Sequence, residues 1–223
     1  MENEIQNKIQ NKIQNKIQNK KPKKIGGLFL NGEFDKSEIT QKFDLVVACD
    51  GGYKNAIDAG ITPNVLVGDM DSLVKTPDGV KIFKYPSEKD FTDGEAGLEY
   101  LVENGCDEIF IYFGLGKRLS HTISNLQMAS KYAGEANITF FGMQEKVMLK
   151  SGTFSLNEKI GSTISIAPIS GQVHIISSKG LKYPLESLTL QTNSARGVSN
   201  IAVGKIQEVT FQEGVLLVSV WEG

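Results

Sequence analysis

The chain has 223 residues, of which 40% are hydrophobic and 22% are charged, as in an ordinary globular protein. This composition excludes a disordered chain or a collagen-like fibre, and no apolar run approaches the ~18 residues that a membrane-spanning helix needs. Only two histidines and two cysteines occur, so a histidine-rich zinc site is nearly excluded. We expect Cys49 and Cys106 to be buried thiols. Because the N-terminus lacks the apolar core of a signal peptide, we expect a cytoplasmic protein.

The net charge of -2 conceals two regions of opposite charge. Residues 1–24 contain seven lysines and two glutamates, whereas the rest of the chain contains 17 basic and 24 acidic residues. An acidic body argues against nucleic-acid binding as the main activity. It is compatible with nucleotide binding, because a divalent metal can bridge carboxylates and phosphates.

The first segment, residues 1–24, is a low-complexity basic tail in which IQNK occurs four times between Ile5 and Lys20. Its isoleucines recur every four residues and drift by about 40° per step around a helix, which leaves only a thin apolar stripe. We interpret the segment as a solvated tail, with a partner-binding helix as the alternative. Pro22 separates it from the first predicted strand, so we leave the tail out of the fold.

Residues 25–145 alternate apolar runs with helix-like stretches, which is the pattern of a mostly parallel sheet covered on both faces. The predicted strands are 25–30, 44–50, 64–69, 81–86, 108–114 and 137–142, and the predicted helices are 52–60, 92–104 and 121–133. Thr92 and Glu95 have the spacing of a capping box at the start of the second helix. This region is therefore a predicted α/β domain.

Residues 146–223 contain short β-rich runs separated by turn residues, with no convincing helix. The predicted strands are 146–150, 152–156, 162–168, 172–177, 182–185, 188–192, 208–212 and 215–220. Regularly spaced short strands are typical of a small all-β sandwich or barrel, so we expect a second domain of this class.

Acidic or glycine-rich sequences follow four strands of the predicted α/β sheet. They are Asp50, the pair Asp69 and Asp71, the pair Asp90 and Asp93, and the loop 114–118. In an open α/β sheet, ligands bind beyond the carboxyl ends of the strands. Any one of these aspartates alone is best explained as a turn or cap residue. Four clusters at the same edge indicate a functional site.

Several aspartates around one crevice repel each other unless a cation neutralises them. Carboxylates without histidine or cysteine favour Mg²⁺, usually held together with substrate phosphates. Lys117 and Arg118 are candidates to bind phosphate oxygens, Arg118 in a bidentate manner. The loop around them matches neither a P-loop nor the dinucleotide-binding fingerprint.

Five sequence blocks, in order along the chain, resemble the thiamin pyrophosphokinase family. They are ACDGGYKNAIDAGITPNVLVGDMDS, KDFTDGEAGLEY, GLGKRLSHTISN, GLKYPL and GVSN. The resemblance implies an α/β nucleotide-binding catalytic domain (25–145) and a β thiamin-binding domain (146–223). It also implies a homodimer with active sites at the subunit interface. The implied reaction is Mg²⁺-dependent transfer of pyrophosphate from ATP to the hydroxyl of thiamin, which yields thiamin diphosphate and AMP.

The resemblance also implies roles for individual residues. The catalytic and Mg²⁺-binding carboxylates of the family correspond to Asp69, Asp71 and Asp93. Its nucleotide-site residues correspond to Asp50, Asp90 and Thr92. Its thiamin contacts, made from the partner subunit, correspond to Ser199 and Asn200. On the sequence alone, a plain β-turn is the favoured interpretation of the GVSN segment. We expect Arg118 to help neutralise phosphate charge and Asp71 to accept the proton of the alcohol. Sequence does not decide which aspartate is the base and which binds metal.

One position departs from the family pattern, because Ser120 stands where the family has aspartate. As helix N-caps the two residues are nearly equivalent, but serine carries no charge. Three alternatives stay open. One is a phosphatase, suggested by GDMDS, and another is a related diphosphokinase with another small alcohol as acceptor, such as a pterin. The third, suggested by Ser120, is a non-catalytic sensor of thiamin or nucleotide.

Overall fold

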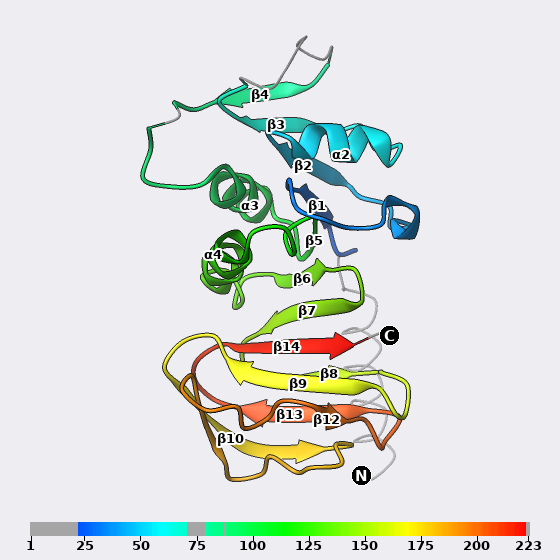
Figure 1. Ribbon diagram of the computed structural model, residues 1–223, viewed down its shortest axis with the longest axis vertical. Coiled ribbons are helices and arrows are strands. Elements are labelled where there is room, and N and C mark those ends of the chain that lie inside the picture. Colours follow the sequence, from blue (N-terminus) through cyan, green and yellow to red (C-terminus); the bar gives the residue numbers. More distant parts are fainter. Residues whose placement is uncertain (1–21, 71–78, 87, 222–223) are drawn as a thin grey trace, which may run out of the picture.

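The structure, a computed structural model, describes residues 22–70, 79–86 and 88–221. A ten-stranded sheet runs through both halves of the molecule in the order β12-β9-β14-β7-β6-β5-β1-β2-β3-β4. A four-stranded sheet, β11-β10-β13-β8, lies against its antiparallel end (Figure 1). No helix within these described ranges is long and apolar enough to cross a membrane.

The α/β half contains six parallel strands. They are β1 (Ile25–Phe29), β2 (Leu45–Cys49), β3 (Val65–Gly68), β4 (Lys81–Lys84), β5 (Glu108–Tyr112) and β6 (Asn137–Phe141). The helices are α2 (Gly52–Asp58), α3 (Asp93–Glu103) and α4 (Leu119–Ser130), with a short 3₁₀ turn, η1 (Lys36–Glu38). Figure 1 shows α2 on one face of the sheet, with α3 and α4 on the other. Both faces are therefore covered, which explains why the central strands read as continuous apolar runs.

Helix α3 packs directly on the central strands. Its N-cap is Thr92, whose Oγ1 accepts a hydrogen bond from the backbone N–H of Glu95 at 3.1 Å, as the capping-box spacing predicts. Two leucines of the helix itself, Leu98 and Leu101, are fully buried. A Cβ atom at Gly97 would lie 2.9 Å from the Cys49 sulfur, so glycine lets the helix approach the sheet closely. This close packing fixes the helix N-terminus beside the end of β2.

The β half is antiparallel. Its strands are β7 (Glu145–Lys150), β8 (Phe154–Leu156), β9 (Thr163–Pro168), β10 (Gln172–Lys179), β11 (Thr189–Gln191), β12 (Asn200–Ile201), β13 (Gln207–Phe211) and β14 (Leu216–Trp221). A separate core of alternating residues, among them Ile164, Ile175, Phe211 and Val218, fills the space between the two sheets. The predicted fold class, an α/β domain followed by a small all-β domain, is confirmed.

Some predicted elements differ from the observed ones. Residues 182–185 form a bend and an irregular segment and not a strand, because Pro184 has no N–H to donate and Tyr183 bonds to a side chain. Helix α4 begins at Leu119, two residues before its predicted start. Strand β7 pairs with both β6 and β14, so the hydrogen-bonded sheet is continuous across the predicted domain boundary at 145/146.

Candidate functional site

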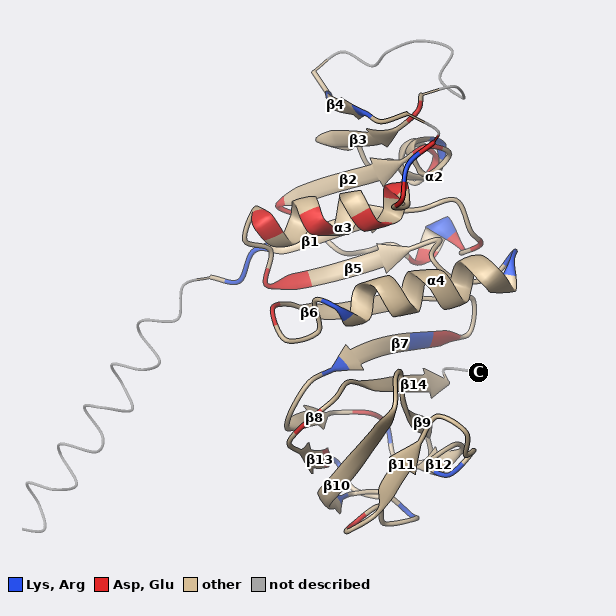
Figure 2. Cartoon of the chain, turned by 90° about the vertical axis from the view of Figure 1, so that its left-hand side faces the viewer, with Lys and Arg blue, Asp and Glu red and all other residues tan. Residues whose placement is uncertain are grey.

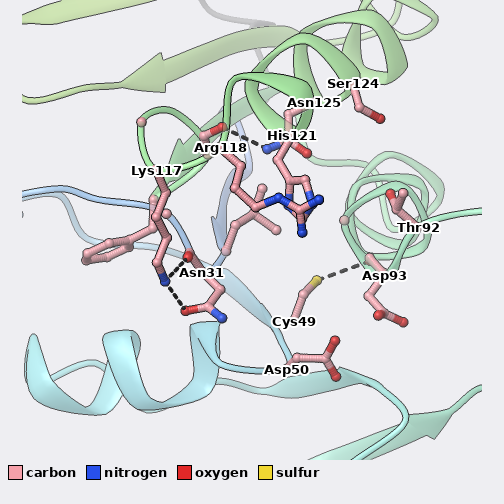
Figure 3. A pocket seen from close by; sticks show the side chains of 16 residues that line it. Asn31, Cys49, Asp50, Thr92, Asp93, Lys117, Arg118, His121, Ser124 and Asn125 are labelled. Atoms are coloured by element: carbon pink, nitrogen blue, oxygen red, sulfur yellow. Dashed lines mark hydrogen bonds between the residues drawn. The ribbon is translucent and has the colours of Figure 1, made fainter. Parts of the chain in front are cut away.

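The strand order of the α/β half reverses at β1. From the edge strand β4, the chain crosses back along α3 to β5, which pairs with the opposite side of β1 from β2. A crevice opens at such a switch point, beyond the carboxyl ends of the strands. A pocket of about 400 Å³ lies there (Figure 3). Its lining residues are Leu30, Asn31, Gly32, Cys49, Asp50, Thr92, Asp93, Gly94, Phe113, Gly114, Gly116, Lys117, Arg118, His121, Ser124 and Asn125.

The backbone around this pocket adopts unusual conformations. Asp50, Phe113 and Lys117 line the pocket with positive φ angles of 45°, 59° and 57°. For residues with a side chain, this region costs about 1 kcal/mol or more, and such strain is concentrated at functional sites. Gly68 at the end of β3 makes room for the strained aspartate, since a Cβ there would lie 1.7 Å from Asp50 Oδ1.

Two carboxylates, Asp50 and Asp93, form the acidic side of the pocket. No N–H or O–H group of the described residues donates a hydrogen bond to the buried Asp50 Oδ1. Burial, the adjacent Asp93 carboxyl and the charge of Asp69 raise the pKa of Asp50 to about 7, although Lys89 opposes this rise. The Lys89 ammonium lies 3.0 Å from Asp93 Oδ1. This end of the pocket therefore has an excess of negative charge near neutral pH.

The opposite wall is the β5–α4 loop and the first turns of α4. In Figure 3, Arg118 and His121 extend into the pocket from this wall. Asn125 fixes the loop by donating from Nδ2 to the Gly114 carbonyl at 2.7 Å. The Lys117 ammonium donates to the backbone carbonyl of Asn31 at 3.0 Å, which ties the loop to the end of β1.

Figure 2 shows acidic residues along α3 and none along α4, which carries no Lys or Arg either.

The N-terminus of α4 has no side-chain cap. Arg118 occupies the N-cap position and makes no side-chain capping hydrogen bond. The first backbone N–H groups of the helix therefore add partial positive charge on the side of the basic residues. Ser120 lies in the first turn and not at the N-cap, and it does not line the pocket.

Cys49 lines the pocket but has a structural role. Its sulfur donates to the Asp93 backbone carbonyl at 3.1 Å, at the N-terminus of α3. Burial, and then the charges of Asp93 and Asp50, raise the pKa of the Cys49 thiol well above its usual range. The thiol stays protonated and helps to hold the backbone of Asp93 in place.

Comparisons with known proteins agree with this geometry. The family model "Thiamin pyrophosphokinase, catalytic domain" matches residues 37–140, and "Thiamin pyrophosphokinase, vitamin B1 binding domain" matches residues 153–216. The chain belongs to the thiamin pyrophosphokinase family. The catalytic-domain match contains all of the pocket's charged residues, whereas Asn31, at the end of β1, precedes it.

Individual relatives support the same assignment. Thiamine pyrophosphokinase of Bacillus subtilis is 27% identical over 192 residues, which cover 82% of this chain and 90% of the relative. Thiamin pyrophosphokinase 1 of Caenorhabditis elegans is 26% identical over 151 residues, 62% of each chain. Among solved structures, thiamine pyrophosphokinase from B. subtilis has a TM-score of 0.79 at 23% identity and covers 89% of this chain and 99% of its own. The enzyme from Geobacillus thermodenitrificans has a TM-score of 0.77 at 24% identity, covering 89% and 98%.

The structure brings together several of the residues predicted for the family site. Asp50, Thr92, Asp93, Lys117 and Arg118 line one pocket. Their roles stay predictions. Asp69 follows β3 and is near enough for its charge to affect Asp50. Asp90 is exposed and outside the lining, and Asp71 lies outside the described residues.

The two predicted thiamin contacts lie elsewhere, in the β half. Ser199 is exposed with a φ of 57°, and its backbone N–H donates to Ser165 Oγ. Asn200 is only 2% exposed. Neither lines the pocket of the same chain.

Sequence reasoning missed four polar residues of the pocket: Asn31, His121, Ser124 and Asn125. Asn31 directly follows the first predicted strand, so the strand-end argument could have included it. The other three lie on α4, two of them three and four residues after His121. The helix predicted over 121–133 already contains all three, so this i, i+3, i+4 spacing is the sequence signal that could have found them.

The carboxylates fit a divalent metal held jointly with a substrate. The part of the chain that the structure describes contains no group of three or more His, Cys, Asp or Glu residues arranged to bind a metal. The predicted trio of Asp69, Asp71 and Asp93 stays a prediction, because Asp71 lies outside this part. The buried Asp50 oxygen without a donor, facing a second carboxylate, is nevertheless the environment that a hard cation stabilises. Mg²⁺ typically uses only one or two carboxylates and takes its other ligands from phosphates and water.

Proposed function

We propose that this protein transfers pyrophosphate from ATP to the hydroxyl of thiamin and releases thiamin diphosphate and AMP. The observation that carries the proposal is the pocket at the switch point of the sheet. A carboxylate pair faces a guanidinium and an open helix N-terminus across it, within a chain that matches both domains of the family. Transfers of this kind depend mainly on positioning the reactants and neutralising oxygen charge.

In this proposal the basic wall binds the phosphates of ATP. Arg118 can bind the phosphate oxygens in a bidentate manner, and the N-terminus of α4, which has no side-chain cap, adds partial positive charge beside it. Lys117 adds positive charge while its ammonium remains bonded to Asn31. Thr92 and Asp90 stay candidates for the nucleotide site on the side of α3.

Asp50 and Asp93, together with Asp69 and Asp71, are the residues that would hold the metal, and Mg²⁺ is the ion that we propose. When bound, it would neutralise charge on the transferred phosphates. A carboxylate near the alcohol then accepts its proton. Asp71 is the candidate from sequence, and Asp50, which lines the pocket, is the second candidate. The pH–rate profiles of Asp50→Asn and Asp71→Asn distinguish the two candidates.

We further propose that the protein is a homodimer whose active sites lie at the subunit interface. The pocket is lined only by the α/β half, whereas the region matched to vitamin B1 binding lies in the β half. That region has exposed apolar side chains, among them Tyr183, Val198, Val203 and Ile206. A second copy that places its β half over the pocket would cover these residues and complete the site.

We propose a cytoplasmic location, because both described cysteines are free and buried.

The test is a product assay with purified protein, ATP, Mg²⁺ and thiamin. We expect AMP and thiamin diphosphate in equal amounts, with no AMP when thiamin is omitted. Release of inorganic phosphate alone would favour a phosphatase, turnover only with a pterin alcohol would favour another acceptor, and binding without turnover would favour a sensor. Asp93→Asn is the inactive control, and Asp58→Asn, at a surface ion pair on α2, is the matched active control.

Mixed dimers test the shared site. Two inactive variants, Asp50→Asn and a variant impaired in the β half, are unfolded together and refolded at equal concentration. Half of a random mixture is heterodimer with one intact site, so we expect about a quarter of the parental activity to return. No recovery, with heterodimers verified by mass, would contradict a site shared between subunits.

A further inference from the structure

A second groove, of about 360 Å³, lies between α3 and the strands β3 and β4. Four aromatic residues and three glutamates of α3 line it; the aromatic residues are Phe83, Tyr85, Phe91 and Tyr100. None of the residues that line this groove also lines the pocket at the strand ends. The proposed reaction uses none of these side chains, so the groove has no role in the function described above.

The three glutamates form an acidic stripe along α3. Glu95, Glu99 and Glu103 recur every four residues and therefore share one face of the helix, which contains no Lys or Arg. Among the described residues, only Glu99 of the three has an ion pair, with Lys131 at 3.9 Å. Like charges four residues apart are unfavourable, and so is a glutamate in the last turn of a helix. The stripe thus carries more negative charge than the described residues neutralise.

The aromatic side of the groove is suited to an ammonium group. The Lys81 ammonium lies 4.5 Å from the centroid of the Phe83 ring and 5.5 Å from that of the Tyr100 ring. Tyr85 and Phe91 pack edge to face, with their ring centroids 5.1 Å apart. Aromatic rings attract a cation at such distances, and the methylene stem of a lysine covers apolar surface at the same time. A lysine-rich ligand therefore matches both the rings and the glutamates.

The basic tail joins the fold at the C-terminal end of this stripe. Lys24 donates its backbone N–H to Asp107 Oδ2 at 2.9 Å, and its ammonium donates to the Asn104 carbonyl at 2.8 Å. Asn104 directly follows Glu103. Figure 2 shows these basic residues beside the end of the acidic helix α3. Residues 1–21 are therefore attached close to the groove.

We propose that residues 1–21 bind the groove on α3 of the same chain, with lysines of the IQNK repeats opposite the three glutamates. Lys8, Lys12, Lys16 and Lys20 recur every four residues, which is the period of the acidic stripe, and an isoleucine follows each of the first three. A thin apolar stripe favours a solvated tail, but attraction between opposite charges does not depend on that stripe. The inference does not rest on the proposed function.

The length of the tail allows this contact. At the helical rise of about 1.5 Å per residue, residues 1–21 would reach about 30 Å, and an extended chain would reach further. Helix α3, with 11 residues, spans only about 16 Å. The tail can therefore follow the stripe over its whole length in either conformation.

Carbodiimide crosslinking of the full chain tests the proposal, because it joins a lysine directly to a carboxylate in contact with it. Mass spectrometry identifies the crosslinks at about 0.01 M and about 1 M salt, where the Debye length is about 30 Å and about 3 Å. At low salt, we expect the tail lysines to join Glu95, Glu99 and Glu103 in preference to Glu186 and Glu213, two exposed glutamates of the β half. High salt should reduce these crosslinks about tenfold. An even distribution over exposed carboxylates, or no effect of salt, would overturn the proposal.

Charge reversal separates binding from the reactivity of single carboxylates. Glu99→Lys combined with Glu103→Lys leaves the Glu95 carboxylate available, yet we expect its crosslinks to the tail to fall about tenfold. The matched control, Glu186→Lys combined with Glu213→Lys, keeps them at the parental level. Unchanged crosslinks to Glu95 in the first variant, with its fold verified by circular dichroism, would overturn the proposal.

A tail variant keeps the test decisive if the reversed stripe prevents folding. Lys12→Gln combined with Lys16→Gln leaves α3 intact and removes two charges from the tail. We expect the crosslinks of Lys8 and Lys20 to α3 to fall several-fold, whereas Lys42→Gln, at an exposed lysine before β2, leaves them unchanged. No decrease in the tail variant would contradict binding through the repeated lysines.

Isotope labelling identifies the chain to which the tail binds. Labelled and unlabelled protein are unfolded together, refolded at equal concentration and crosslinked. Crosslinks between the tail and α3 should join two peptides of the same label. A mixed label in about half of them would mean that the tail binds a second copy of the chain, and would overturn the proposal.

Discussion

The two halves of the molecule differ in whether their buried polar side chains have hydrogen-bond partners. In the α/β half, Asp50 Oδ1 is buried at the pocket without a hydrogen-bond donor from the described residues, and three residues around the pocket have strained backbones. In the β half, the carboxamides of Asn200 and Gln207 are buried and bonded to loop backbones. Gln207 accepts from the Glu158 N–H at 3.0 Å and donates to the Gly204 carbonyl at 2.6 Å.

The presence or absence of a hydrogen-bond partner distinguishes side chains suited to bind a ligand from side chains that stabilise the fold. A buried acceptor without a donor destabilises the free protein, and it persists where a bound cation or substrate compensates for it. A satisfied buried amide does the opposite, since it fixes loops that have no strand partner. Substitution should therefore affect activity and stability differently in the two halves.

The largest expected effect is on turnover in the α/β half. Asp50→Asn keeps the size and polarity of the side chain but removes a charge beside the proposed metal, so we expect kcat to fall about a hundredfold or more. Steady-state rates at saturating Mg²⁺ and ATP measure this loss, and circular dichroism verifies the fold. Activity within a few-fold of the parent would remove Asp50 from the site.

In the β half, we expect a loss of stability without a loss of catalysis. Gln207→Leu leaves the Glu158 N–H and the Gly204 carbonyl without a partner, which costs about 2–3 kcal/mol of the free energy of unfolding. Urea unfolding measures this cost, and kcat and the KM for ATP should stay at parental values below the transition. An unchanged midpoint would show that water replaces the carboxamide.

The pH dependence of stability gives a third, smaller effect with a definite sign. The pKa of Asp50 is raised in the folded protein to about 7 from its ordinary 3.8, so folding favours the protonated carboxyl. This contribution is complete below about pH 4 and is lost as the pH rises through 7. Without metal, Asp50→Asn should be more stable than the parent at pH 8, by about 1–2 kcal/mol after allowance for solvent screening.

The same comparison at pH 4 provides the control, because the parental carboxyl is then protonated and the difference should disappear. Thermal melts in EDTA measure both values. Addition of Mg²⁺ with ATP should raise the melting temperature of the parent more than that of the variant. A variant that is less stable than the parent at pH 8 would contradict the raised pKa.

The smallest expected effect is at Ser120, where the family has aspartate. Ser120 lies in the first turn of α4 and outside the pocket lining. Ser120→Asp places a negative charge at the helix N-terminus and should stabilise the fold by about 0.3–1 kcal/mol. If the family charge also serves the site, the Mg²⁺ concentration for half-maximal rate should fall. A slower variant, or one that needs more Mg²⁺, would indicate a site rearranged around serine.

The sequence was most informative where local pattern decides structure. The apolar runs of β1 to β6 and the capping box of α3 formed as predicted, because burial and backbone capping act over a few residues. The common location of Asp50, Asp93 and Arg118 also followed from strand order alone.

The errors occurred where distant contacts decide structure. Residues 182–185 have the composition of a strand, but the carboxamide of Asn200 replaces the strand partner, and no local pattern reveals this contact. Strand β12 has two residues, too few for any alternation to be visible. The role of Asn31 depends on the Lys117 ammonium, 86 positions away in the chain.

The continuous sheet has a consequence for motion. Because β7 is bonded to β6 on one side and to β14 on the other, the described residues contain no break in the sheet between the α/β half and the β half of one chain. A single subunit therefore cannot close its own halves over a substrate. In the proposed dimer, closure around ATP and thiamin must come from a rotation of one subunit against the other, and a crosslink across that interface should slow substrate entry and product release together.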